Sequence, residues 1–131
     1  MAMCVEGAYA QEIKQMSNVK NAPPAGRYFT QHGYSQSYPW IAIGESKSGK
    51  TVTLARVNVD ADPEWKAKMD WYVGGFAGHC GNQEEQTWLF NSVCTMRKVS
   101  IRQSKKGGWV GNGERFTEAK DGPFYFYDYN F

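Results

Sequence analysis

The chain has few of the long aliphatic side chains that usually fill the cores of helical proteins. It contains only two leucines, Leu54 and Leu89, and four isoleucines, against 5 Trp, 8 Tyr and 7 Phe. Aromatic and β-branched residues suit the pleated surface of a sheet, so this composition favours strands over helices. It also supplies rings that can stack on planar ligands. At 131 residues the chain has the size of one domain with its own core.

The sequence also has few cysteines, a small net charge and no long apolar run. Three cysteines, Cys4, Cys80 and Cys94, form no C-x-x-C pair or recognised zinc-ligand spacing, so we expect a reduced protein without a metal. The net charge of +2 gives no global field that attracts polyanions. No apolar run approaches the roughly 20 residues that span a bilayer, and the N-terminus lacks a signal-peptide pattern. We therefore expect a cytoplasmic protein without membrane contact.

Residues Gly44 to Thr51 match the phosphate-loop pattern G-x-x-x-x-G-K-[ST]. That motif needs a strand before the loop and a helix after it, so that backbone N–H groups and the helix N-terminus face the phosphate. The segment after the loop, 51–59, is rich in β-branched residues and favours a strand. The match therefore predicts a β-hairpin and not a nucleotide-hydrolysing site.

The chain is expected to form a single domain over 1–131, mainly β within the α+β class. An apolar stripe predicts one helix at about residues 5–19, and the Pro23–Gly26 segment ends it. A β-rich body, an antiparallel sheet or a barrel-like domain, follows over about 27–131. Its predicted strands are 27–31, 38–43, 51–59, 86–91, 96–103, 109–110 and 124–131, with turns at 105–108 and 111–113 and one helical turn capped by Asp62.

A glycine-rich segment, Gly74 to Gln86, holds the densest cluster of polar groups in the sequence. His79 and Cys80 are adjacent, and adjacent side chains of an extended chain point to opposite sides, so they make a poor nucleophile–base pair. Two interpretations stay open here. The segment is either a structured loop whose side chains bond the backbone, or a ligand-binding loop in which His79, Asn82 and Gln83 supply hydrogen bonds.

A basic segment, 97–106, carries five cations and no acid. In a strand, Lys98 and Arg102 share one face, and with Arg97 they could neutralise phosphate oxygens. The alternative is an ordinary solvated strand face. Trp88 and Phe90 share a face of the preceding predicted strand, where they are either a stacking surface beside these cations or part of the core.

The last eight residues, Phe124 to Phe131, are aromatic on both faces of a predicted strand. Such a strand is buried between layers or between subunits. We therefore expect a homo-oligomer, with a central strand inside one monomer as the alternative.

Several segments together resemble a group of small tailed-phage and prophage proteins. They are Glu45–Val52, the Gly-Gly-Phe-Ala-Gly-His-Cys-Gly-Asn-Gln stretch at 74–83, the basic strand followed by Lys-Lys-Gly-Gly-Trp, and Phe-Tyr-Asp-Tyr-Asn-Phe at 126–131. The chain is more distantly similar to the phage anti-Thoeris sponge proteins, which bind a cyclic ADP-ribose isomer and withhold it from a bacterial defence effector. This resemblance implies an anti-defence role in the cytoplasm of an infected bacterium.

The sequence thus leads to the hypothesis of a non-enzymatic protein that sequesters a small cyclic nucleotide signal, a cyclic ADP-ribose isomer or a cyclic oligonucleotide. No catalytic residue, cofactor or metal is expected. The expected ligand-binding residues are His79, Asn82, Gln83, Trp88, Phe90, Arg97, Lys98 and Arg102. The alternative is a phage interaction module that binds a host protein or single-stranded nucleic acid, with nucleic acid as the less favoured partner.

Overall fold

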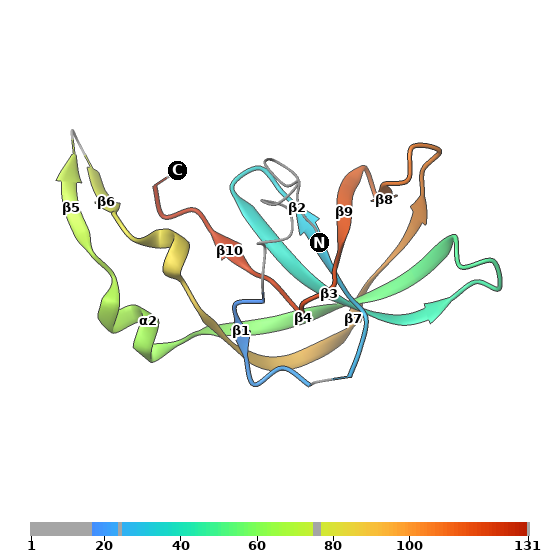
Figure 1. The fold of residues 1–131 in the computed structure, drawn as a ribbon, viewed down its shortest axis with the longest axis horizontal. Helices are drawn as coiled ribbons and strands as arrows, with labels where there is room; N and C mark the ends of the chain where they lie inside the picture. Colours follow the sequence, from blue (N-terminus) through green and yellow to red (C-terminus); the bar gives the residue numbers. More distant parts are fainter. Residues whose placement is uncertain (1–16, 24, 75–76, 131) are drawn as a thin grey trace, which may run out of the picture.

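The computed structural model describes residues 17–23, 25–74 and 77–130, and it is mainly β (Figure 1). Its elements, in chain order, are β1 (Val19–Lys20), β2 (Tyr28–His32), β3 (Gln36–Glu45), β4 (Thr51–Ala61), α2 (Pro63–Lys68), β5 (Trp71–Gly74), β6 (Ala77–Cys80), the 3₁₀ turn η1 (Gln83–Glu85), β7 (Trp88–Gln103), β8 (Trp109–Gly111), β9 (Glu114–Ala119) and β10 (Phe126–Tyr127). None of the helices in these ranges is both long and apolar enough to cross a membrane.

The expected mainly β class is confirmed, and six strands pair in a closed ring, which corresponds to the barrel-like alternative of the two arrangements expected from the sequence. The order around the ring is β7–β4–β3–β2–β9–β8, every pair is antiparallel, and β8 pairs back onto β7. That closing pair is short, since only Arg102 and Gln103 of β7 meet β8. Outside the ring, β1 lies parallel to the start of β7 and β10 lies antiparallel to β3.

Alternating apolar residues on the strands fill the ring. The core cluster consists of Phe29, Trp40, Val52, Leu54, Val99, Ile101, Trp109 and Phe116. Phe29 meets Trp109, and Trp40 meets Phe116, edge to face with ring centroids 5.5 and 6.2 Å apart. Each such side chain contributes about 1.5–3 kcal/mol when fully buried. Aromatic rings thus supply the core volume that the scarce leucines do not.

The phosphate-loop match is a β-hairpin, as predicted. Its turn joins β3 to β4 through hydrogen bonds from Ser46 N to Thr51 O (2.9 Å) and from Gly49 N to Ser46 O (3.0 Å). Gly49 takes φ 75°, a conformation that favours glycine. Because Thr51 starts strand β4 rather than a helix, no helix N-terminus faces this turn.

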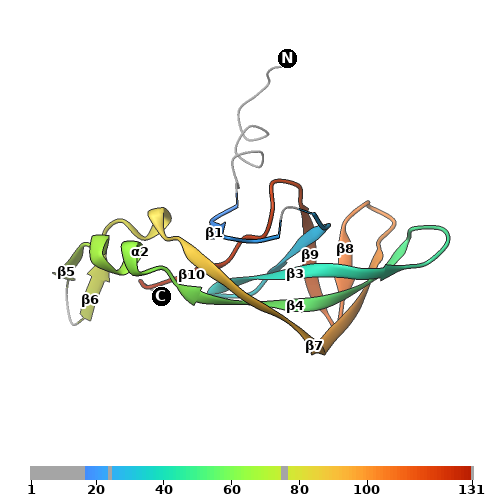
Figure 2. The same ribbon diagram turned by 90° about the horizontal axis from the view of Figure 1, so that it is seen from below.

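Beyond the ring, β4 and β7 continue together to a smaller unit made of α2, β5, β6 and η1 (Figures 1 and 2). Asp62 caps α2 as predicted, with its Oδ1 accepting from Glu64 N at 3.1 Å, and Pro63 opens the helix. Trp65 of α2 is buried. The glycine-rich segment 74–86, expected as a loop, instead contains strand β6, which pairs with β5 as a separate two-stranded sheet.

The C-terminal segment is held by side-chain amides along one edge. The Asn18 side chain donates to Tyr125 O (2.6 Å) and accepts from Tyr125 N (2.9 Å), and Gln86 makes the same two contacts with Tyr127 at 3.0 and 2.9 Å. Gln83 Oε1 accepts from Tyr129 N at 2.8 Å. On its other edge β10 pairs with β3. Amides thus take the place of a neighbouring strand. The predicted strand 124–131 is β only at residues 126–127. Residue 131 lies outside the described ranges.

Three further expectations need correction. Residues 5–16 of the predicted helix lie outside the described part of the chain, and Val19, its last residue, belongs to strand β1. The predicted strands 86–91 and 96–103 are one strand, β7, because pairing with β4 continues past an irregularity. Strand β9 was not predicted, since its charged and polar residues, with one buried Phe116, give weak alternation.

Candidate anion-binding cleft

A bulge in β7 shapes the surface that we consider the candidate ligand-binding site. Ala55 of β4 pairs with Lys98, but the next residue, Arg56, pairs with Cys94. Three residues of β7, 95–97, therefore have no partner on β4. Bulges of this kind re-aim side chains and are common beside functional sites.

A cleft of about 380 Å³ opens where this bulge faces the β8–β9 hairpin. It lies beyond the short β7–β8 pairing, where the two walls separate. The β7 wall is made of Met96, Arg97, Lys98 and Val99, the opposite wall of Gly111, Asn112, Glu114 and Phe116, and the inner end of Gln31 and Trp40. The Trp40 indole Nε1 donates to Gln31 Oε1 at 3.0 Å, which fixes the amide beside the buried ring.

Two exposed cations, Arg97 and Lys98, line the β7 wall. The ion pairs of the described residues involve Lys20 and Arg27 instead, and neither the Arg97 nor the Lys98 side chain forms a hydrogen bond within the described part of the chain. Their donors are therefore free to meet a ligand in the cleft.

Arg56 adds a third positive charge, partly buried beside this cleft. It is paired across the sheet with Trp40, and its guanidinium carbon lies 4.1 Å from the centroid of the Tyr38 ring and 5.6 Å from that of Trp40. No carboxylate or hydrogen-bond acceptor among the described residues contacts it. Burial, and then the positive charge of Arg97, lowers the pKa of Arg56. Because arginine stays protonated in proteins, Arg56 keeps its positive charge beside these rings.

The predicted ligand residues fall into separate places. Arg97 and Lys98 line the cleft, as the phosphate-binding interpretation requires. Arg102 lines a neighbouring cleft of about 400 Å³, which shares Gly111 and Asn112 with the first. The other five predicted residues lie in the smaller unit or along the first half of β7, so the structure does not bring the eight together.

Asn82 and Gln83 use their amides on the backbone of their own unit. The Asn82 side chain accepts from Asp70 N (2.9 Å) and donates to Lys68 O (2.8 Å), which joins the end of α2 to β5. Gln83 holds Tyr129, as described above. The His79 ring lies beside the Tyr72 ring, with centroids 5.5 Å apart. For Asn82 and Gln83, these contacts favour the interpretation in which polar groups of the segment bond the backbone.

Trp88 is a core residue and not an open stacking surface. It is buried, meets Tyr125 edge to face at a centroid distance of 4.5 Å, and donates from Nε1 to Gln86 Oε1 at 2.9 Å. Phe90 is partly buried on β7 opposite Val59. Both residues lie in the first half of β7. They do not line the cleft that contains Arg97 and Lys98, which we call the arginine cleft.

Sequence reasoning missed Arg56, Gln31, Trp40 and Glu114 as residues of this region. One signal could have pointed to Arg56. It follows Val52 and Leu54 at period two, so it occupies the core face of a strand, where an unpaired cation is unusual. No local spacing pointed to the other three residues, and Gln31, for example, meets Phe116 of β9 through a pairing distant in sequence.

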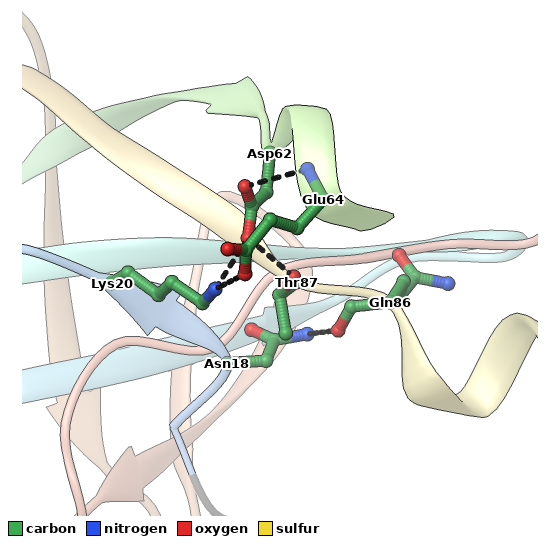
Figure 3. A network of polar contacts seen from close by, with 6 residues as sticks. All are labelled: Asn18, Lys20, Asp62, Glu64, Gln86 and Thr87. Atoms are coloured by element: carbon green, nitrogen blue, oxygen red, sulfur yellow. Dashed lines mark hydrogen bonds and ion pairs between the residues drawn. The ribbon is translucent and has the colours of Figure 1, made fainter. Parts of the chain in front are cut away.

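A second polar cluster, at the junction of β1, β4 and β7, is satisfied internally (Figure 3). The buried Asp62 carboxylate accepts from Thr87 Oγ1 at 2.8 Å and from the Lys20 ammonium at 2.7 Å, besides capping α2. The hydrogen bond from Lys20 is the main reason that the pKa of Asp62 lies below its ordinary value. Because these contacts link β1, the end of β4 and the start of β7, this cluster joins the small unit to the strands of the barrel.

No metal site is evident in the described ranges, which hold no group of three or more His, Cys, Asp and Glu side chains suited to one. Cys80 is buried and Cys94 partly buried, and both are free thiols. Comparisons with known proteins found no matching family model, no matching curated protein and no matching solved structure.

Proposed function

We propose that the protein binds a small phosphate-bearing nucleotide in the arginine cleft and holds it without transforming it. The observation that carries the proposal is the pair Arg97 and Lys98, two exposed cations that line one cleft without an anionic partner among the described residues, with Arg56 nearby on β4. Two like charges that line one cleft raise the free energy of the empty protein, and an anion bound to both relieves it.

Phosphate matches these groups in geometry as well as charge. Guanidinium presents a planar fork of N–H donors that meets two phosphate oxygens at once, and Lys98 adds a compact charge beside it. The amides of Gln31 and Asn112, which also line the cleft, can bond base or sugar edges. A volume of about 380 Å³ falls within the range of small-molecule sites.

Sequestration, rather than turnover, suits the composition of the cleft. Among the described residues that line it, Glu114 is the only one with a carboxylate, and no histidine or cysteine accompanies it. The resemblance to phage proteins supports an anti-defence role, in which the bound ligand is a cyclic ADP-ribose isomer or a cyclic oligonucleotide used as a signal. A second copy of the chain, in the proposed homo-oligomer, would help to enclose the open side of the cleft.

Calorimetric titration of the full chain with AMP, cyclic ADP-ribose isomers and cyclic dinucleotides tests the proposal. A charged hydrogen bond is worth about 1.5–3 kcal/mol, so Arg97→Ala and Arg56→Met should each weaken binding roughly 10- to 100-fold. Lys66→Ala, which removes an exposed cation on α2, and Lys50→Ala, in the phosphate-loop match, should leave affinity unchanged.

Two results would overturn the proposal. One is an affinity that Arg97→Ala and Arg56→Met leave intact, with folding of both variants checked by circular dichroism. The other is chemical conversion of the bound nucleotide, detected by chromatography after incubation with the wild-type protein.

A further inference from the structure

Glu114 places a carboxylate in the same cleft, on the wall opposite the cations. It is the first residue of β9 and pairs with Gly111 across the β8–β9 turn. Asn112 and Gly113 form this turn with φ of 49° and 76°, values typical of a tight hairpin connection. The position of Glu114 at the cleft is therefore set by a short, well-defined hairpin.

The carboxylate of Glu114 has no polar partner among the described residues. The residue is exposed, and its side chain forms no ion pair or hydrogen bond with another residue of the described ranges. It does not neutralise Arg97 or Lys98, although all three line one cleft. The cleft thus has a cationic wall on β7 and an acidic wall on β9.

A ligand that is anionic throughout does not suit such a cleft, because the carboxylate would repel it. The two walls together suit a molecule with phosphate at one end and hydrogen-bond donors at the other. A carboxylate is an acceptor only, and its two oxygens can receive both hydroxyls of a ribose, as acidic residues do in dinucleotide-binding sites.

We propose that Glu114 accepts hydrogen bonds from ribose hydroxyls and makes the cleft selective for ribonucleotides over deoxyribonucleotides. This inference rests on the nucleotide-binding function proposed above. It assigns Glu114 as a specificity-determining residue, while Arg56, Arg97 and Lys98 supply affinity for phosphate.

The test compares AMP, 2′-deoxy-AMP and pyrophosphate by calorimetry with the full chain. Loss of one hydrogen bond to a charged group corresponds to about tenfold in affinity, so wild type should bind AMP about tenfold more tightly than 2′-deoxy-AMP. Glu114→Ala should bring that ratio close to one. The same substitution should strengthen pyrophosphate binding, because it removes a repulsive charge. The matched control is Glu84→Ala, which removes an exposed carboxylate on η1. It should alter neither the ratio of AMP to 2′-deoxy-AMP affinity nor the affinity for pyrophosphate.

The outcomes separate this inference from the function on which it rests. If Glu114→Ala strengthens AMP and pyrophosphate alike, Glu114 acts only by repulsion and the inference falls while nucleotide binding stands. Equal affinity of the wild type for AMP and 2′-deoxy-AMP also overturns it. Absence of binding by all three probes, or binding indifferent to Arg97→Ala, overturns the proposed function and the inference together.

Discussion

Asp62 and Arg56 are two charged side chains that are partly or fully withdrawn from solvent. They differ in the polar partners that they contact. Asp62 meets Lys20, Thr87 and the backbone of α2. Arg56 has aromatic neighbours but no acceptor among the described residues. A buried charge without a partner is costly, and proteins keep such groups mainly where a ligand supplies the partner. This contrast is the reason that we assign Asp62 a structural role and propose a ligand-binding role for Arg56.

The Asp62 contacts predict a loss of stability in acid. Because the folded pKa lies below the ordinary value of 3.8, the folded state binds this proton less readily than the unfolded chain does. The stabilisation is complete above the unfolded pKa and is lost as the pH falls through the folded value. Urea unfolding from neutral pH to about pH 2 should show this decline, with a shallower one in Asp62→Asn.

The matched control for this prediction is Glu85→Gln, which neutralises an exposed carboxylate on η1. It should keep the wild-type pH dependence below about pH 4. If Asp62→Asn and wild type lose stability in parallel over that range, the carboxylate does not act as described.

At the scale of elements, the β8–β9 hairpin does two things. Its strand β8 closes the barrel onto β7, and its turn and first β9 residue form a wall of the cleft. Close approach of β8 to β7 depends on Gly111. A Cβ at this position would lie 2.7 Å from Ser100 O and 2.8 Å from a methyl group of Ile101.

Gly111→Ala should therefore destabilise the fold by about 1–3 kcal/mol, the usual range for overpacking against a fixed backbone. Gly44→Ala is the matched control, because no heavy atom lies within 4 Å of a Cβ added there. It should be neutral or slightly stabilising, since alanine lowers the entropy of the unfolded chain. Urea unfolding of both variants measures this, and equal stabilities would show that β8 has room to move.

Local sequence patterns were sufficient to predict the hairpin turn after β3, the turns on either side of β8 and the Asp62 cap. These features depend on residues within a few positions of one another. Strands β5, β6 and β9 were not predicted, and β7 was divided in two. Short strands of mixed polarity take their state from the partners beside them, as β9 does between β2 and β8.

The cleft was predictable only in part, for the same reason. Arg97 and Lys98 stood out as a run of cations, but the pairings that bring β4 beside β7 and β9 beside β2 join residues far apart in sequence. The side-chain amides of Asn82, Gln83 and Gln86, by contrast, form hydrogen bonds mainly with backbone atoms. Spacing alone does not distinguish an amide bound to its own chain from one available to a ligand.

At the scale of the whole molecule, the positive groups extend beyond one cleft. Arg102 lines the neighbouring cleft, which shares the Gly111–Asn112 rim with the first. A small nucleotide would occupy the first cleft, whereas a single strand of nucleic acid could follow β7 past both. The two ligand classes therefore differ in how many cations they engage.

Salt dependence distinguishes them. A single strand that engages Arg97, Lys98 and Arg102 should lose roughly 20-fold in affinity between about 50 and 200 mM salt, because the slope of log K against log salt is about −0.7 per neutralised phosphate. Arg102→Ala should make that slope shallower by about 0.7. A nucleotide held in the first cleft should depend less on salt, and Arg102→Ala should leave its slope unchanged. Titrations of wild type and Arg102→Ala with AMP and with a short oligonucleotide measure both slopes.

One outcome would replace nucleotide sequestration with strand binding: an oligonucleotide that binds more tightly than AMP and whose salt slope is reduced by Arg102→Ala. Only a ligand that spans both clefts can neutralise all three cations at once.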